Sequence, residues 1–489
     1  MNKTLGVFNT KNMNVFKNQK TVIIQKQLLH ELKININTYN QINKNKLKLD
    51  IAIYFLSLFN SIPSYYREDK NDNDFINLNS KILKKASSRY KQYFDFFLNK
   101  DYILKGANYS TDKGESNSFK LNEDYSKDEI TLYHLSDKIL LKAFIKVEDL
   151  MKVNENNIFC KNKRPHLTKY FNQDLRINYD EAFSELKMLL PLKYRKFTNG
   201  CQIVNEFINQ YWRYSIKPET DNRVHSNLTR SPKIIRKYLT YKGEQIEGVD
   251  VKTSQPFFLA VILEAILKKD KSLFNKIKAN KIFPNEVIDE LFNLKLNQKE
   301  ISDFIDSVTK KDFYNEFSKK LTFKYDEEGK VYRMVSNFTT KDKVRKRRRK
   351  NNNSHSKVTY KDERDATKKI VMELFYSSPN SRVKEASIFR KQFPCIHKVF
   401  DCIYKNNVPL HHLLQYVEAY ILLDYVALKI SKQYPEMPLW SIHDCLVTTS
   451  SNIYLLQERM IQSIKEITTF TPQLEIETWK DKEDILEAS

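Results

Sequence analysis

Glycine and cysteine are scarce in this chain of 489 residues, which contains seven glycines and five cysteines. The glycines form no Walker A or G-x-G-x-x-G loop, so a glycine-rich phosphate cradle is excluded. The cysteines form no C-x-x-C pair, which argues against a structural zinc site. An odd number of scattered cysteines is typical of a protein in a reducing compartment.

Long apolar runs are also missing. The sequence has no stretch of about 18 apolar residues for a membrane-spanning helix, and no signal-type apolar core near the N-terminus. We therefore expect a soluble, intracellular protein of the cytoplasm with no membrane partner.

Positive charge is in excess, with a formal net charge of +23. This favours an anionic polymer as partner, although a merely lysine-rich protein is the alternative. Eight of the ten residues at 341–350 are lysine or arginine. We expect a basic loop at residues 341–357 that binds nucleic-acid phosphates, with a nuclear-localisation signal as the other interpretation. The phosphate ligands expected there are Arg345, Lys346, Arg347, Arg348 and Arg349.

Two aspartates lie in patterns that suit metal binding. His443 and Asp444 interrupt apolar and β-branched residues, which predicts a tight β-hairpin with an acid at its tip. Most turn aspartates make only local hydrogen bonds. However, Asp250 ends a second predicted strand, just before an apolar helix. Carboxylates on neighbouring strands can hold two metal ions roughly 3.5–4 Å apart, the arrangement used for phosphoryl displacement.

A cationic helix is predicted between the two acids, at residues 362–377. Arg364, Lys368, Met372 and Tyr376 recur every four residues and therefore share one face of this helix. Two cations followed by an apolar and an aromatic side chain suit a nucleoside triphosphate. A solvated basic face on an ordinary amphipathic helix is the alternative.

The order of these segments resembles motifs A, B and C of family-A DNA polymerases and of the related single-subunit phage and mitochondrial RNA polymerases. Residues 221–229 resemble the segment before motif A that touches template and primer, and residues 411–425 resemble the palm helix before motif C. The resemblance covers residues 185–480. The matching positions are Arg223, Asp250, Arg364, Lys368, Tyr376, Gln415, His443 and Asp444.

The resemblance implies an α+β fold of the right-hand polymerase type, with an antiparallel palm sheet and helical fingers and thumb. It implies template-directed extension of a nucleic-acid 3′ end with nucleoside triphosphates, on DNA or alternatively RNA. Asp250, Asp444 and a backbone carbonyl near Val251 would bind two Mg²⁺ ions, with Mn²⁺ as the alternative. Lys368 and Arg364 would hold the phosphates.

The remaining roles also follow from the resemblance. Tyr376 would stack near the nascent base pair, while Gln255 and Met372 would inspect the sugar. Arg223 and Gln415 would position the template and primer, and His443 would support the primer-terminal phosphate.

Four positions depart from the pattern of the family's DNA polymerases, and one of them is Met372, which resembles the RNA polymerases more than the aromatic residue typical of the DNA enzymes. Ser377 follows Tyr376 where glycine is usual, and Cys445 follows Asp444 where the DNA polymerases carry glutamate. Gln255 stands where DNA polymerases have a glutamate that blocks a ribose 2′-hydroxyl and RNA polymerases have glycine, so the sugar preference stays open. A primase-like or primer-independent RNA synthesiser with the same palm is one alternative function. A catalytically inactive nucleic-acid-binding protein is another.

We expect three domains. Residues 1–160 form a mostly helical nucleic-acid-binding domain, residues 161–245 thumb-like helices with the Arg223 segment, and residues 246–489 the palm and fingers. Within the first domain, predicted helices at 20–62 and 81–99 precede a hairpin around 110–117. This order resembles a winged-helix module, with a helical scaffold as the alternative. Two thumb-like helices are predicted at 179–190 and 204–214, and His411 and His412 are taken as ordinary helix-start residues.

Overall fold

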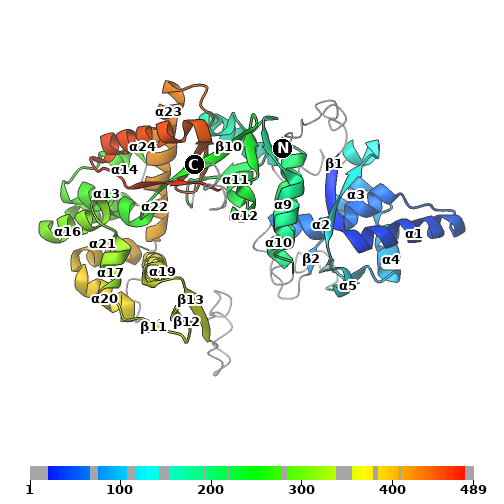
Figure 1. Ribbon diagram of the computed structural model, residues 1–489, viewed down its shortest axis with the longest axis horizontal. Coiled ribbons are helices and arrows are strands. Elements are labelled where there is room, and N and C mark those ends of the chain that lie inside the picture. Colours follow the sequence, from blue (N-terminus) through cyan, green and yellow to red (C-terminus); the bar gives the residue numbers. More distant parts are fainter. Residues whose placement is uncertain are drawn as a thin grey trace, which may run out of the picture.

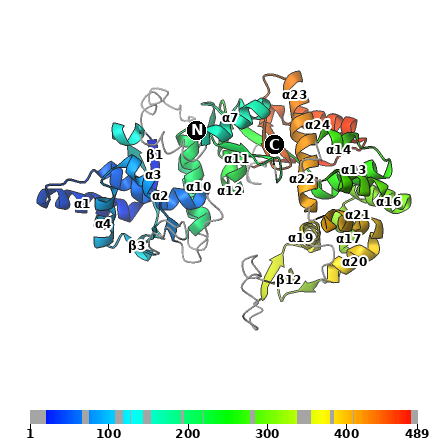
Figure 2. The ribbon, with the colours of Figure 1, turned by 180° about the vertical axis from the view of Figure 1, so that it is seen from behind.

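The computed structural model describes most of the chain. In Figure 1 and Figure 2, an N-terminal lobe of helices and short strands lies on one side of α10, and a larger body built around a curled antiparallel sheet lies on the other. The fold is α+β. The described residues are 20–65, 75–106, 117–126, 128–142, 153–190, 194–218, 220–277, 284–336, 355–377, 384–406 and 409–479.

The N-terminal lobe has its own aromatic core, in which Phe55, Tyr93 and Phe97 are almost fully buried. The predicted hairpin is confirmed, because β3 pairs antiparallel with β4. The helix predicted at 81–99 is two helices. The lobe contains α1 (Lys26–Ile42), α2 (Leu49–Tyr65), β2 (Ile76–Asn77), α3 (Ser80–Ala86), α4 (Tyr90–Asn99), β3 (Ile103–Lys105), β4 (Ser118–Leu121) and α5 (Glu123–Ser126).

The strand β1 (Lys20–Gln25) joins the two parts of the molecule. It pairs antiparallel with β5 (Ile130–Leu135), so the prediction that the whole of 20–62 is helical is wrong at its start. The β-branched run Thr-Val-Ile-Ile favours a strand there. Val22 and Ile24 belong to the core of the lobe, whereas Ile23 belongs to the core of the larger body. Side chains on the two faces of β1 therefore pack into two different cores.

The helix α10 (Tyr194–Ile208) faces this junction. Thr21 donates from its backbone nitrogen to Asn209 Oδ1 at 2.8 Å and from its hydroxyl to Asn205 Oδ1 at 2.6 Å. The helix predicted at 204–214 is wrong at both ends, because buried Phe197 extends it backwards and Gln210, with φ 51°, ends it. The neighbouring elements are α7 (Val153–Lys163), α8 (Pro165–Thr168), α9 (Tyr179–Lys187), β7 (Tyr214–Ile216), β8 (Val224–Ser226), α11 (Asn227–Arg230) and α12 (Lys233–Arg236).

The central sheet has six strands in the order β14-β15-β10-β9-β6, with β16 also paired to β10, and every pairing is antiparallel. The strands are β6 (Leu175–Ile177), β9 (Leu239–Tyr241), β10 (Glu244–Val251), β14 (Trp440–Ile442), β15 (Cys445–Thr449) and β16 (Leu474–Glu477). The helices around them are α13 (Ser254–Leu267), α22 (Leu410–Ala419), the π-helix η4 (Tyr420–Val426), α23 (Ala427–Gln433), the short η5 (Ser450–Asn452) and α24 (Ile453–Thr468). The apolar run after Asp250 thus forms the buried helix that its composition predicts.

A second helical group and a small sheet complete the larger body. The cationic helix predicted at 362–377 is confirmed as α19 (Glu363–Tyr376), with Asp362 capping its first turn. The small sheet has the order β11-β12-β13. The elements are α14 (Ser272–Lys276), α15 (Asn285–Asn293), α16 (Gln298–Thr309), α17 (Phe313–Ser318), β11 (Lys324–Tyr325), β12 (Val331–Ser336), β13 (His355–Tyr360), α20 (Lys384–Gln392) and α21 (Pro394–Lys405).

The basic run lies between β12 and β13, which pair antiparallel up to Ser336 and His355. Residues 337–354, and with them the five cations predicted as phosphate ligands, lie outside the described residues. Among the helices of the described chain, none is both long and apolar enough to cross a membrane.

Candidate active site

Asp250 lies near the end of β10, and Asp444 lies in the loop just before the adjacent strand β15. β10 and β15 are antiparallel, and the register partner of Asp250 is Cys445, the residue after Asp444. Residues directly opposite each other have Cβ atoms roughly 4.5–5.5 Å apart, so both aspartates belong to one corner of the sheet.

The hairpin at the end of this corner is confirmed. Ile442 pairs with Cys445, which leaves His443 and Asp444 as a two-residue loop between β14 and β15. His443 adopts φ 56°, as tight hairpin loops require of at least one residue. The loop geometry therefore fixes the backbone that carries Asp444.

The two aspartates influence each other electrostatically. Burial, followed by the negative charge of Asp444, raises the pKa of Asp250 to about 8. Glu477 and Glu475 on β16 raise the pKa further, whereas Lys368 of α19 lowers it. The charge of Lys368 thus acts on Asp250, so the cationic helix lies within electrostatic range of the acid pair.

The acid pair fits magnesium. No group of three or more His, Cys, Asp and Glu side chains is placed to hold a metal ion in the part of the chain that the structure describes. Magnesium commonly binds one or two carboxylates and takes its other ligands from water and substrate phosphates. A divalent cation would also relieve the repulsion between Asp250 and Asp444. Val251, whose carbonyl is the third expected ligand, is the next residue of β10 and is buried.

Gly248 leaves space for the packing beneath the acids. A Cβ at this position would lie 2.4 Å from Cys445 Sγ and 3.6 Å from Trp479. Every longer side chain must therefore displace Cys445, which lies opposite Asp250.

Gly248→Ala is expected to destabilise the protein by about 1–3 kcal/mol, because the added methyl group has no space beside Cys445 Sγ. Replacing Cys445 with Ala in the same chain removes Sγ and should recover most of that loss. Urea denaturation of both single variants and the double variant measures the coupling. Strictly additive losses would show that the two side chains do not compete for this space.

Arg223 and Glu418 form a buried ion pair next to the aspartates. The guanidinium donates from Nε to Glu418 Oε1 at 2.7 Å and from Nη2 to Oε2 at 2.6 Å. Burial raises the pKa of Glu418 to about 7, Arg223 opposes this, and the charge of Asp444 adds to it. Arg223 thus lies between a buried glutamate and the corner that carries Asp444, rather than free in solvent.

Gln255 also contacts Glu418. It lies in the first turn of α13, is 5% exposed, and donates from Nε2 to Glu418 Oε2 at 2.8 Å. Ser254 Oγ adds a further bond to the same oxygen at 3.3 Å. One carboxylate on α22 therefore connects the Arg223 segment to the start of the helix that follows Asp250.

The expected triphosphate face of α19 points away from its buried side. Lys368 and Tyr376 are exposed, and Arg364 and Met372 are half-buried, whereas Ile370 and its neighbours face the core. Arg364 is part of an ion pair. Its Nε donates to Asp312 Oδ2 at 2.6 Å.

Tyr376 makes two contacts with α22. Its ring stacks on His411 at 4.4 Å between centroids, and its hydroxyl accepts a bond from Gln415 Nε2 at 3.1 Å. His411 lies in the first turn of α22, as predicted for a helix-start residue, and it also supports the ring of Tyr376 at the end of α19. Burial, together with His412, lowers the pKa of His411 to about 4, so the stacked ring is neutral.

The pKa of His443 is lowered as well. Burial lowers its pKa, and the nearby positive charge of Arg223 lowers it further. The hairpin residue thus lies close to Arg223 at the edge of the site.

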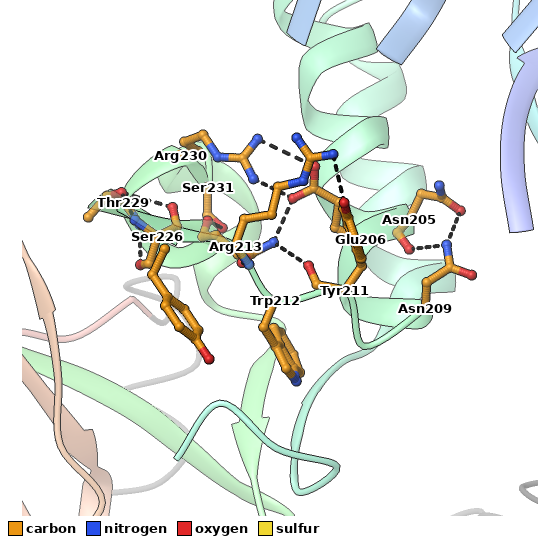
Figure 3. Close-up of polar contacts among 12 residues, drawn as sticks. Asn205, Glu206, Asn209, Tyr211, Trp212, Arg213, Ser226, Thr229, Arg230 and Ser231 are labelled. Carbon is orange, nitrogen blue, oxygen red and sulfur yellow. Dashed lines mark hydrogen bonds and ion pairs between the residues drawn. The ribbon is translucent and has the colours of Figure 1, made fainter. Parts of the chain in front are cut away.

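Glu206, near the C-terminal end of α10, binds residues that follow Arg223 in the same segment (Figure 3). Glu206 is 1% exposed, and its Oε2 accepts from Arg230 Nη2 at 2.5 Å and from Asn227 Nδ2 at 2.6 Å. Ser226 caps the short α11 in between, with reciprocal bonds to Thr229. Two buried glutamates, Glu206 and Glu418, therefore fix opposite ends of this segment.

A third ion pair supports the same segment. Arg164 is fully buried, makes two bonds to Asp424 on η4 at 2.6 and 2.8 Å, and donates from Nη1 to the carbonyl of Asn222 at 2.5 Å. Asn222 itself has φ 53°, so its strained backbone is held just before Arg223.

Sequence reasoning missed Glu418, Glu206 and Arg164. For Glu418 a signal was present, since it is the single charged residue in the mostly apolar run 413–423. A buried charge needs a partner, and an unexplained acid in an apolar helix face indicates one.

Comparison with known proteins identifies no family for this chain. No protein-family model matches the chain, and no curated protein matches it. Among solved structures, the chain is similar to the POL domain of Pol1 from M. smegmatis in complex with DNA primer-template and dNTP, with 12% identity and a TM-score of 0.24. The match covers 59% of this chain and 52% of that one, so it spans about half of the polymerase domain. A TM-score of this size carries no argument about function.

Proposed function

We propose that this protein is a template-directed nucleotidyltransferase of the right-hand polymerase type, which extends a nucleic-acid 3′ end with nucleoside triphosphates. The observation that carries the proposal is the register that sets Asp250 beside the Asp444 hairpin, within the electrostatic reach of Lys368. An acid pair opposite a cationic helix suits a triphosphate with its divalent cations.

In this proposal Asp250 and Asp444, with the carbonyl of Val251, hold Mg²⁺ or Mn²⁺. The chemistry that the bound ions would supply is charge compensation at the attacking hydroxyl and at the leaving pyrophosphate. Lys368 provides a positive charge beside the same corner. Charge placed where negative charge develops in the transition state is the main contribution such residues make.

The other residues orient the substrates. Arg223, held between Glu418 and Asp444, would contact the primer terminus, and Tyr376, stacked on His411, would flank the nascent base pair. Arg364 would contribute to phosphate binding from its site next to Asp312. The strongly basic chain and its run at 341–350 would bind the backbone of DNA.

This division also assigns the parts of the chain. Residues 246–489 would be the palm and fingers, residues 161–245 the thumb-like segment, and the N-terminal lobe an additional nucleic-acid-binding domain. The lobe would bind a nucleic-acid duplex with its helices and hairpin, and this role would be separate from catalysis.

Extension of a labelled primer on a DNA template tests the proposal. We expect nucleotide addition with Mg²⁺ or Mn²⁺ and none after chelation by EDTA. A parallel reaction on an unprimed template distinguishes primer extension from initiation of new chains. The absence of incorporation on both templates with both ions would contradict the proposed activity.

A further inference from the structure

The small sheet β11-β12-β13 has one covered face and one open face. In the register of β12 and β13, Val331 is opposite Tyr360, and both are buried in a cluster with Ala366 of α19. Alternate residues of a strand point to opposite faces of a sheet, so the residues at the positions between them face away from α19. The sheet projects from the α19 end of the larger body (Figure 1, Figure 2).

The open face combines apolar and cationic side chains. By register it carries Tyr332, Met334, Lys357 and, on β11, Lys324. Met334 is 55% exposed, Tyr332 is half-buried, and both lysines are exposed. The ammonium of Lys357 lies 4.6 Å from the centroid of the Tyr332 ring. Aromatic and apolar side chains next to cations form the kind of surface on which bases and phosphates both find partners.

The charge around this face differs between its two ends. The turn between β11 and β12 carries three acids at 326–328, and Asp326 pairs with Lys357 at 3.8 Å. At the other end, the segment that joins β12 to β13 contains the eight lysines and arginines at 341–350. A polyanion is therefore attracted to the end of the sheet where Met334 lies opposite Lys357.

Met334 and Tyr332 favour a single strand over a duplex. In a duplex the bases stack on one another inside the two backbones, so phosphates, sugars and groove edges are what a protein contacts. In a single strand the base faces are free to stack on aromatic side chains. The apolar part of the open face therefore has a partner in a single strand and none in a duplex.

Arg333 attaches the sheet to the cationic helix. It lies on the covered face, with Nη1 3.1 Å from Glu373 Oε2 on α19 and Nη2 3.5 Å from Glu385 Oε1 on α20. Its side chain is only 18% exposed, so water screens these ion pairs little. A strand bound on the open face would therefore be held at a fixed place relative to α19, which carries Lys368 and Tyr376.

We propose that the open face of the small sheet binds single-stranded nucleic acid, with bases packed on Tyr332 and Met334 and phosphates next to Lys324 and Lys357. The bound strand would be the part of the template that has not yet been copied. This assignment to the template rests on the proposed polymerase function, whereas the binding of a single strand does not.

Fluorescence anisotropy with the full-length protein tests the surface. The probes are a labelled DNA strand of about 20 nucleotides and the duplex made from it, at one salt concentration because salt changes both affinities. The double variant Tyr332→Ala/Met334→Ala removes the apolar contacts and keeps every charge. It should raise Kd for the single strand by about 5- to 30-fold and Kd for the duplex by less than about 2-fold.

Tyr454→Ala is the matched control for the loss of an exposed ring. Tyr454 is 76% exposed on α24, and its truncation should leave both dissociation constants within about 2-fold of the original. The ratio of two dissociation constants from one preparation is insensitive to a partial loss of folded protein. An unchanged Kd for the single strand in the double variant, or an equal rise for the duplex, would overturn the proposed surface.

Primer extension tests the assignment to the template. On a template that extends beyond its primer, the double variant should raise KM for the DNA by about 5-fold or more and leave kcat unchanged. An unchanged KM alongside weaker single-strand binding would refute the template as the bound strand. No extension by the unaltered protein would remove the proposed function and the template assignment with it, while anisotropy would still decide whether the sheet binds a single strand.

Discussion

Asp444→Asn is expected to reduce primer extension on the order of 1,000-fold or more, while binding of duplex DNA stays within about 2-fold of the original. Asparagine has nearly the same shape as aspartate, so the two-residue hairpin loop can form as before. The substitution removes a negative charge that a divalent cation needs as ligand. Single-turnover extension and fluorescence anisotropy with a labelled duplex measure the two quantities.

Asp289→Asn is the matched control for this variant. Asp289 is exposed on α15 and pairs with Lys271 at 2.5 Å, on an element that does not border the acid pair. The same chemical change there should leave extension unaltered. Extension by Asp444→Asn within tenfold of the original would refute the assignment of the hairpin aspartate as a metal ligand.

Asp250→Asn is expected to abolish extension yet to stabilise the metal-free protein at pH 8, by about 2–4 kcal/mol in the free energy of unfolding. The pKa of Asp250 in the folded protein is about 8, raised by burial and by Asp444 above its usual 3.8. Between pH 4 and pH 8 the unfolded chain has therefore lost a proton that the folded protein retains. Stability falls as the pH rises through this window, and asparagine removes the decline.

The thermal midpoint at pH 4, 6 and 8 without divalent cations measures this effect. All three tryptophans lie in the larger body, at positions 212, 440 and 479, so their fluorescence follows the unfolding of that part. The gain in midpoint should grow from pH 4 to pH 8, and Mg²⁺ should raise the midpoint of the original protein more than that of the variant. An equal gain in midpoint at all three pH values would show that ionisation of Asp250 does not destabilise the folded protein.

The sequence predicted the elements that carry local chemical patterns. Apolar and β-branched residues on both sides of His443 and Asp444 predicted the hairpin, and the four-residue spacing from Arg364 to Tyr376 predicted α19. Strand register is not a local property, so the pairing of Asp250 with Cys445 could be inferred only from the resemblance to known motifs. The structure supplies it directly.

The supporting contacts could not be predicted because they join distant parts of the chain. Arg164 and Asp424 are 260 residues apart, and Arg223 and Glu418 are 195 residues apart. Composition offers no means to pair one arginine with one acid among the many in this chain. Residues 20–25 were wrongly predicted as helix for a related reason. Their strand conformation depends on pairing with β5, more than one hundred residues later.

The double use of β1 constrains any attempt to divide the protein. Its odd and even side chains pack into different cores, and Thr21 bonds to Asn205 on α10 and to Asn209 just after that helix. Removal of the first 150 residues would take away both β1 and β5, expose the apolar side chains of the larger body that Ile23 and Ile130 cover, and remove the hydrogen bonds between Thr21 and the two asparagines. The lobe and the larger body should therefore unfold together, and the larger body alone should be prone to aggregate unless this edge is redesigned.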